Sequence, residues 1–279
     1  MTNKKPIIGI IGGAGPDATI DLQLELSRAM KEYLGAITDQ EHIRVITDNY
    51  TDMPDRSTAL EAKGISPLSH MISSAKRLEQ LGCDIILYPC NTAHAYLKDI
   101  QKSVDTPILD MIYLTCKSIK DDLSYSDKVG MLCTDMTKKL NLYSDDKINF
   151  LYPNKENQEL VMQAIFAAKA GQIFSAISDP RIINKIRSYL LSINALNPSS
   201  PCFKTSATAM LKSAIENLIE HGARKIILGC TEIPLCISDK EIEEQYGVIV
   251  YNPTRILAQA AVVALKTQLQ PKVNYSEAS

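Results

Sequence analysis

Two cysteines that lie 140 residues apart stand in similar sequence surroundings. Cys90 belongs to the segment PCNTAH (residues 89–94), and Cys230 belongs to the segment LGCTEIPL (residues 228–235). Each follows a short apolar run and precedes a helical pattern. Each thiol is therefore expected near helix N-terminal amides, whose positive potential favours the thiolate. A single buried cysteine is usually only a small apolar side chain, but the matched pair points to thiol chemistry.

A weak internal repeat carries both cysteines. The same offset pairs Leu78 with Leu218, Gly82 with Gly222, Ile86 with Ile226 and Cys90 with Cys230. The repeat predicts that each cysteine ends a buried parallel strand, which is where open α/β sheets bind their ligands. If the two units face each other, the two thiols address one cavity from opposite sides.

Polar residues accompany both thiols. Asn91, Thr92 and Thr231 offer amide and hydroxyl groups that can hold a carboxylate, although the same residue types are ordinary helix caps. Glu232 could orient the neighbouring thiol or take up its proton, or it could be an acid that a first helical turn favours. His94 could carry a proton, or it could be a core or surface histidine.

Two further segments suit small-molecule binding. The glycine-rich run IIGGAGP (residues 10–16) follows the first apolar run, but it lacks the spacing of a dinucleotide fingerprint, and Pro16 removes an amide that a pyrophosphate would need. Its glycines are instead expected to bring the backbone close to a small substrate. Arg56 ends the segment PDR (residues 54–56), beyond the second apolar run, where a guanidinium suits a carboxylate.

The elements that must position these residues alternate between short apolar runs and helical patterns, which is typical of parallel βα units. The expected strands are Ile7–Ile11, Ile43–Ile46, Asp84–Tyr88, Pro107–Leu109, Val129–Cys133, Ile148–Tyr152, Lys225–Gly229 and Val248–Tyr251. This pattern predicts an α/β fold of two pseudo-symmetric domains. Each domain has a mostly parallel four-stranded sheet flanked by helices, and the active site lies in the interdomain cleft.

The domain boundaries follow from the same pattern. The first domain takes residues 1–113 and a C-terminal helix over 252–270, and the second takes residues 114–251. Residues 170–205 are interpreted as an insertion over the second domain, and residues 271–279 as a frayed tail.

The composition excludes several classes of protein. The 279 residues carry a net charge of −2 without a Lys/Arg-rich run, so no nucleic-acid partner is expected. No apolar stretch reaches the roughly 20 residues that span a bilayer. The start of the chain lacks a signal-peptide cleavage pattern, which favours the cytoplasm. The seven cysteines form no C-x-x-C pair and there are four histidines, so neither a disulfide framework nor a metal site is expected.

Taken in order, the four motifs IIGGAGP, PDR, PCNTAH and LGCTEIPL resemble the cofactor-independent aspartate/glutamate racemase family. The resemblance runs from about Ile7 to the helix after Pro253. It implies two similar α/β domains around one active site, an amino-acid substrate, no pyridoxal phosphate or other cofactor, and usually a homodimer.

The resemblance also implies roles for single residues. Cys90 and Cys230 match the two catalytic cysteines, and Arg56 matches the anchor of the substrate side-chain carboxylate. Lys204, which stands 26 residues before Cys230, matches a substrate-binding lysine of the family. The predicted binding set is completed by Asn91, Thr92 and Thr231, where the family holds the α-carboxylate and amine, by Ala14 in the glycine-rich loop, and by Glu232.

The branch of the family follows from two motifs and two departures. Glutamate racemases typically carry Asp-Ser-Gly near the amino end and Gly-Cys-Thr-His at the second cysteine, where this chain has Gly-Gly-Ala-Gly and Gly-Cys-Thr-Glu. Aspartate is therefore the favoured substrate. Ala14 replaces a commonly larger residue and Asn252 an often acidic one, so glutamate and a broader range of amino acids stay open.

The leading hypothesis is a two-base racemisation of aspartate. One thiolate removes the α-proton, and the thiol on the opposite face delivers another. One alternative is a relative that uses a single cysteine, such as a maleate isomerase or a decarboxylase. Another is a non-catalytic amino-acid-binding module that kept the cleft without the chemistry.

Overall fold

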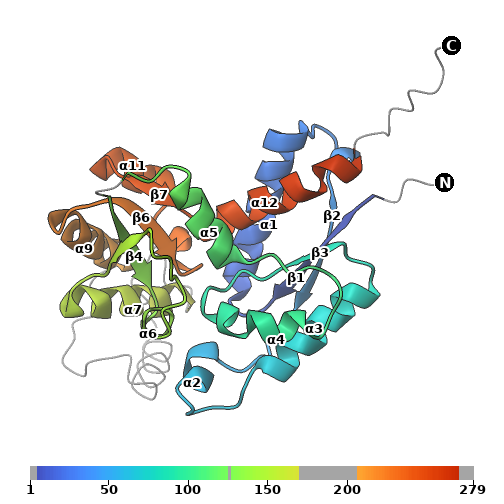
Figure 1. Cartoon of the computed structure of the whole chain (residues 1–279), viewed down its shortest axis with the longest axis horizontal. Helices are drawn as coiled ribbons and strands as arrows, with labels where there is room; N and C mark the ends of the chain where they lie inside the picture. The colour runs from blue at the N-terminus through green and yellow to red at the C-terminus, as the bar shows by residue number, and fades with distance from the viewer. Residues whose placement is uncertain (1–4, 125–126, 170–205, 270–279) are drawn as a thin grey trace.

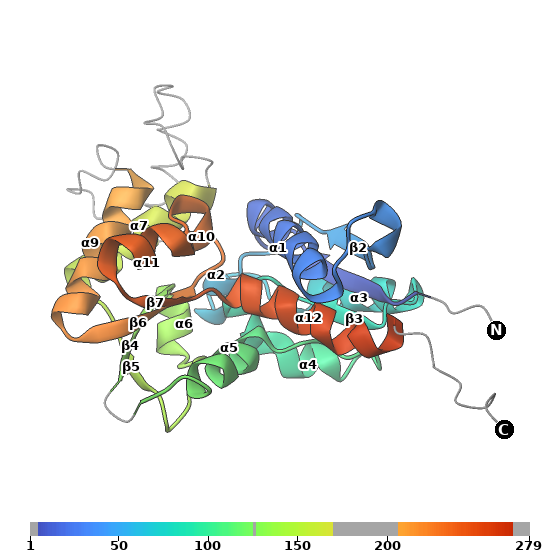
Figure 2. The same cartoon turned by 90° about the horizontal axis from the view of Figure 1, so that it is seen from above.

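The computed structural model describes residues 5–124, 127–169 and 206–269. Figures 1 and 2 show two sheets that lie side by side, each with helices packed on it. The strands within each sheet are parallel. Lys204, the predicted insertion at 170–205 and the predicted tail at 271–279 lie outside the described residues.

The first sheet has the strand order β2-β1-β3. Strand β1 spans Ile7–Gly12, β2 spans Arg44–Asn49 and β3 spans Ile85–Leu87, and β1 pairs in parallel with both neighbours. The fourth strand, expected at Pro107–Leu109, is reduced to one parallel bridge between Ile86 and Ile108. This corrects the prediction of four full strands. The pairing is short because β3 has only three residues and Pro107 has no N–H to donate.

The second sheet has the strand order β5-β4-β6-β7, with every pair parallel. Its strands are β4 Lys128–Cys133, β5 Asn149–Leu151, β6 Ala223–Gly229 and β7 Ile249–Tyr251. All four match predicted strands. The order repeats that of the first sheet with the bridge at Ile108 in the place of β7. The strands that lead to the two cysteines, β3 and β6, therefore hold equivalent positions, as the internal repeat predicts.

The helices connect the strands and cover the sheets (Figure 1). They are α1 Pro16–Leu34, α2 Arg56–Leu60, α3 Leu68–Gln80, α4 Leu97–Gln101, α5 Met111–Lys120, α6 Asp135–Lys139, α7 Lys155–Lys169, α9 Ala207–Glu220, α10 Ile233–Cys236, α11 Asp239–Tyr246 and α12 Pro253–Leu269, with short 3-10 turns η1 at Asp39–Glu41 and η2 at Thr92–Tyr96. Helix α1 begins with Pro16. Proline has no N–H to donate, but the first amides of a helix have no helical acceptor, so no hydrogen bond is lost there. The helix ends at Gly35, whose φ of 70° suits a left-handed helix cap.

Apolar side chains cover both faces of each sheet, which is why the strands are apolar throughout. In β1, Ile8 and Ile10 pack toward α1 and α12, while Ile7 and Ile11 pack toward α3. The second sheet packs one face against α7 and α9 and the other against α5.

Helix α5 connects the two cores. Its Met111 belongs to the core of the first sheet, whereas Ile112, Cys116 and Ile119 belong to that of the second. Helix α12 returns the chain to the first sheet, where it packs on α1 and α5 (Figure 2). The exact boundaries 1–113, 114–251 and 252–270 stay a prediction. In the described part of the chain, no helix combines the length and the apolar character that crossing a membrane requires.

Candidate active site

The two cysteines of the repeat line one small cavity between the sheets. Cys90 follows β3 and Cys230 follows β6, and the two residues are 8% and 6% exposed. The cavity measures about 20 Å³, which is room for about one water. Its lining comprises Ala14, Asp55, Arg56, Ser57, Cys90, Asn91, Thr92, Thr134, Lys169, Cys230, Thr231 and Glu232. Eight of the nine residues predicted for the site therefore meet at one place, and the ninth, Lys204, is outside the described residues.

The backbone around the two cysteines is alike. The carbonyl oxygen of Cys90 accepts a hydrogen bond from Ala93 N–H at 3.2 Å, and that of Cys230 accepts one from Ile233 N–H at 3.0 Å. Each cysteine thus begins a helical turn at the carboxyl end of a parallel strand. This geometry brings backbone amides toward the ligand position.

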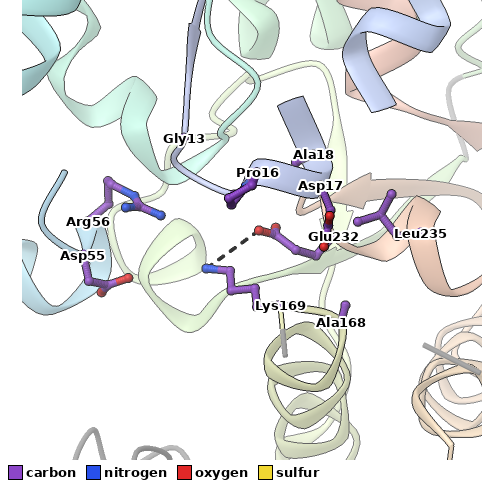
Figure 3. Close-up of a pocket in the computed structure, with 11 residues that line it drawn as sticks. Gly13, Pro16, Asp17, Ala18, Asp55, Arg56, Ala168, Lys169, Glu232 and Leu235 are labelled. Atoms are coloured by element: carbon purple, nitrogen blue, oxygen red, sulfur yellow. Dashed lines mark ion pairs between the residues drawn. The ribbon is translucent and has the colours of Figure 1, made fainter. Parts of the chain in front are cut away.

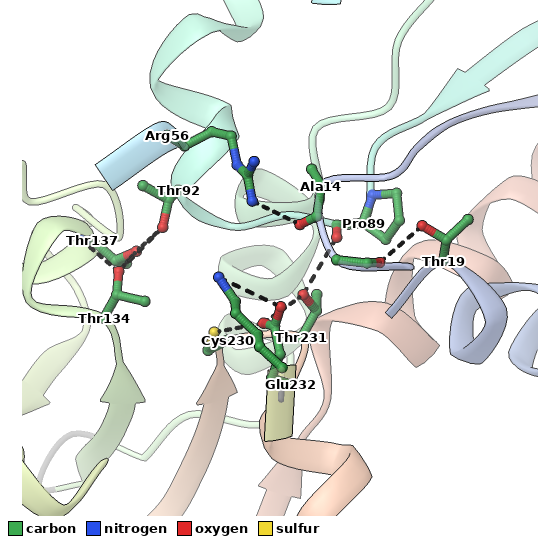
Figure 4. Close-up of polar contacts among 12 residues, drawn as sticks. Ala14, Thr19, Arg56, Pro89, Thr92, Thr134, Thr137, Cys230, Thr231 and Glu232 are labelled. Carbon is green, nitrogen blue, oxygen red and sulfur yellow. Dashed lines mark hydrogen bonds and ion pairs between the residues drawn. The ribbon is translucent and has the colours of Figure 1, made fainter. Parts of the chain in front are cut away.

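The Cys230 thiol donates a hydrogen bond to the Glu232 carboxylate, with 2.9 Å between Sγ and Oε2. Figure 4 shows the two side chains turned toward each other. Burial raises the pKa of Cys230 well above its usual range, and the Glu232 charge raises it further, while the Lys169 charge opposes them. Cys230 therefore retains its proton and can act as an acid.

Lys169 ends α7 beside Glu232, with 3.8 Å between Nζ and Oε1 (Figure 3). Desolvation lowers the pKa of Lys169, but the negative charge of Glu232 raises it overall. The ammonium group is therefore charged and faces the site. The sequence interpretation missed Lys169, and a basic residue at the end of an amphipathic helix carries no local signal of such a role.

Arg56 is fixed at the beginning of α2, where the Asp55 side chain accepts the Thr58 amide at 2.8 Å. Its guanidinium is buried and donates to the carbonyl oxygen of Ala14 at 3.1 Å (Figure 4). Burial opposes the charge, but the nearby Cys90, Tyr88 and Asp55 groups raise the pKa of Arg56. The glycine-rich loop and Arg56 therefore hold each other in place.

A cluster of hydroxyl groups links the turn after Cys90 to the beginning of α6. Thr92 Oγ1 lies 3.1 Å from Thr134 Oγ1 and 3.2 Å from Thr137 Oγ1, and the last two are 3.0 Å apart (Figure 4). Tyr143 donates its hydroxyl to Asn91 Oδ1 at 2.5 Å. The sequence interpretation also missed these partners. Thr134 directly follows the predicted strand Val129–Cys133, and this position at a strand end is the signal that could have found it.

Three buried polar atoms at the cavity have no hydrogen-bond partner among the described residues: Arg56 Nε, Asn91 Nδ2 and Glu232 Oε1. Buried polar groups are normally paired, so such atoms indicate a place for a ligand. Two of them donate and one accepts. An amino acid offers the complementary groups, because its carboxylate accepts and its ammonium donates.

A larger cavity of about 200 Å³ adjoins the small one and shares Asp55, Arg56, Lys169 and Glu232 with it (Figure 3). The glycine-rich loop forms one side. Gly15 has a φ of 130°, and a Cβ there would lie 2.8 Å from Glu232 Oε1. Only glycine allows this approach of the loop to the carboxylate. Among the described residues, no group of three or more His, Cys, Asp or Glu side chains is arranged to hold a metal ion.

The two-sheet architecture has known counterparts. The chain matches the family model of the Asp/Glu/hydantoin racemases over residues 11–179 and 199–261, and it belongs to this family. It is an amino-acid racemase of the Asp/Glu type, which sets aside the non-catalytic binding module.

Two similar proteins and one structural neighbour illustrate the comparison. The aspartate racemase of Picrophilus torridus is 27% identical, with a TM-score of 0.71 and coverage of 94% of each chain. A broad specificity amino-acid racemase of Bacillus subtilis (strain 168) is 28% identical over 180 residues, which cover 62% of this chain and 72% of that protein. The glutamate racemase RacE1 of Bacillus anthracis shares the fold, with 17% identity, a TM-score of 0.57 and coverage of 95% of this chain and 83% of that chain.

Proposed function

We propose that this racemase interconverts L- and D-aspartate, without a cofactor, by a two-base reaction in which Cys90 and Cys230 act on opposite faces of the α-carbon. The observation that carries the proposal is that both thiols line one cavity and follow equivalent strands. A single base would tend to return the proton to the face from which it came, whereas two bases invert the centre.

The proton balance is as follows. One thiolate takes the α-proton and becomes a thiol, and the opposite thiol gives its proton to the carbanion and becomes a thiolate. The reverse reaction exchanges these roles. The α-hydrogen of an amino acid is weakly acidic, so hydrogen-bond donors must stabilise the charge that develops on the carboxylate. One well-placed donor contributes about 3 to 4 kcal/mol.

Asn91 suits the α-carboxylate, because its Nδ2 is buried next to Cys90 without a hydrogen-bond partner. Glu232 Oε1 is a suitable acceptor for the substrate ammonium. Arg56 and Lys169 add two positive charges to the same lining, and together they suit the side-chain carboxylate of an acidic substrate. These two cations favour aspartate over neutral amino acids.

The small cavity must widen before an amino acid can bind, because about 20 Å³ holds little more than one water. The adjoining 200 Å³ cavity shares four lining residues with the small one, and we propose it as the route of entry. Its volume also accommodates a side chain longer than that of aspartate. This favours glutamate, or a wider range of substrates, as the second candidate.

The experiment is a chiral assay of the purified enzyme against both enantiomers of aspartate, glutamate and several neutral amino acids, without added cofactor. Aspartate should have the highest kcat/KM. The variants Cys90→Ala and Cys230→Ala should each lose racemisation, whereas Cys236→Ala, which changes a buried cysteine outside the cavity lining, should retain it. Full turnover by either of the first two variants rejects the two-base assignment and favours a one-cysteine mechanism.

We further propose a homodimer, as the resemblance implies, together with a cytoplasmic location and the domain division at residues 113 and 251. Analytical ultracentrifugation of the full chain tests the first, and fractionation of the source cells tests the second. A sedimentation coefficient that corresponds to one chain rejects the dimer.

A further inference from the structure

His94 lies one helical turn after Cys90 and connects two backbone groups. Its Nδ1 is 2.9 Å from the carbonyl oxygen of Cys90, and its Nε2 is 3.1 Å from the amide nitrogen of Met111. Both ring nitrogens are therefore engaged, one with the Cys90 backbone and the other with the beginning of α5.

These two contacts determine the tautomer. The Met111 amide can only donate, so Nε2 must be the bare nitrogen that accepts. Nδ1 then carries the proton and donates it to the Cys90 carbonyl. An imidazolium would lose the bond to Met111. Burial lowers the pKa of His94, and the bond to Cys90 and the Asp110 charge offset only part of this lowering. The ring is therefore neutral and holds no free nitrogen for proton transfer.

The bond to Met111 also has a structural consequence for α5. The first amides of a helix lack helical partners. The Asp110 side chain accepts the Tyr113 amide at 2.9 Å, and His94 accepts that of Met111. Helix α5 then continues into the core of the second sheet through Ile112 and Ile119. His94 thus connects the Cys90 backbone to the helix that joins the two sheets.

We propose that His94 is a positioning residue for Cys90: its neutral Nδ1–H tautomer holds the Cys90 carbonyl against α5 and so sets the position of the thiol relative to the second sheet. The inference rests on the proposed function insofar as Cys90 is a base. Cys230 lacks a histidine at the equivalent position, because the repeat places Pro234 where His94 stands. The effect of His94 therefore falls on one of the two thiols.

Two substitutions separate the two bonds. In His94→Asn the amide nitrogen takes the place of Nδ1, which keeps the donor to Cys90 and removes the acceptor for Met111. In His94→Gln the longer side chain reaches the place of Nε2, which keeps the acceptor for Met111 and removes the donor to Cys90. We expect H94Q to lose about 10²-fold in kcat with KM changed less than about threefold, because a small misplacement of a reacting group can cost that much. We expect H94N to recover at least about tenfold over H94Q.

A second readout does not depend on turnover. Iodoacetamide alkylation of each cysteine, followed by peptide mass spectrometry, gives the ratio of the Cys90 rate to the Cys230 rate in each protein. H94Q should change this ratio by at least about fivefold, and H94N should keep it closer to the wild-type value, because only the former releases the Cys90 carbonyl. If the wild type fails to racemise aspartate, the proposed function is wrong, and this ratio still tests the positioning role.

A third measurement needs no variant. Long-range ¹⁵N NMR of histidine-labelled protein, with the ring signals assigned to their residues, should show the His94 ring protonated at Nδ1 and bare at Nε2 at neutral pH. An Nε2–H tautomer or an imidazolium at His94 overturns the proposal. An equal loss of kcat in H94N and H94Q that follows their loss of thermal stability also overturns the proposal. An unchanged ratio of the Cys90 to the Cys230 alkylation rate in H94Q overturns it as well.

Discussion

The substitution Glu232→Gln tests how the site keeps one thiol protonated. Glu232 is 4% exposed, and its Oε2 accepts the proton of Cys230 at a distance of 2.9 Å. A thiolate at that distance from a carboxylate would experience a repulsion of about 6 kcal/mol at an effective dielectric constant of about 20. Lys169 offsets part of this repulsion. Even a quarter of it, about 1 to 2 kcal/mol, changes the thiolate population about tenfold.

The sign follows from the direction of the shift. Glu232 raises the pKa of Cys230, so the thiol keeps its proton as the pH rises through neutrality. A neutral glutamine removes that contribution, and the pKa of Cys230 falls. A two-base racemase needs one protonated thiol, so the alkaline limb of the kcat/KM profile should move to lower pH in E232Q. At pH 7, the alkylation rate of Cys230 should rise about tenfold.

The assay is the pH profile of aspartate racemisation together with iodoacetamide alkylation of Cys230. Glu241→Gln is the matched control, because Glu241 also pairs with a lysine, Lys212, at 2.8 Å, but lies on the surface. E241Q should leave both profiles unchanged. An alkaline limb that stays in place or moves to higher pH in E232Q would refute the reasoning, as would an unchanged Cys230 alkylation rate.

Two further predictions concern the walls of the site. Lys169→Met removes one of the two cations that line the cavity. Because a hydrogen bond to a charged group contributes about 1.5 to 3 kcal/mol, KM for aspartate should rise about 10- to 100-fold in steady-state assays. Lys212→Met is the control, and an unchanged KM in K169M argues against the role of Lys169. Gly15→Ala introduces a Cβ 2.8 Å from Glu232 Oε1 and should lower kcat at least about tenfold. Gly35 also has a positive φ, of 70°, but a Cβ there would meet no atom within 4 Å. Gly35→Ala should therefore lower Tm in calorimetry without lowering kcat. Equal kcat losses in the two glycine variants would contradict this prediction.

Local sequence patterns determined more of the sheets than of the site. A parallel strand that is buried on both faces reads as a short apolar run, so β1, β4 and β6 were predictable, as were the cysteines at the ends of β3 and β6. The apolar run Pro107–Leu109 predicts a full strand, whereas the structure has only a bridge at Ile108. The run itself does not reveal that its neighbour β3 supplies only three residues for pairing.

The side chains that reach the cavity from elsewhere could not be read in the same way. Lys169 stands at the end of α7, and its approach to Glu232 depends on how α7 packs on the second sheet. The hydroxyl cluster of Thr92, Thr134 and Thr137 joins residues that are up to 45 positions apart. The neutral state of His94 depends on Met111, which no local motif connects to it.

The most direct test of the two-thiol account is the fate of the α-hydrogen. L-aspartate is incubated with the enzyme in D2O, and the α-deuterium content of both enantiomers is measured by NMR or mass spectrometry at low conversion. The account predicts that the D-aspartate formed carries solvent deuterium while the remaining L-aspartate carries almost none, with the mirror result from D-aspartate. D-aspartate that retains the original hydrogen, or equal deuterium in substrate and product from the beginning, would contradict it.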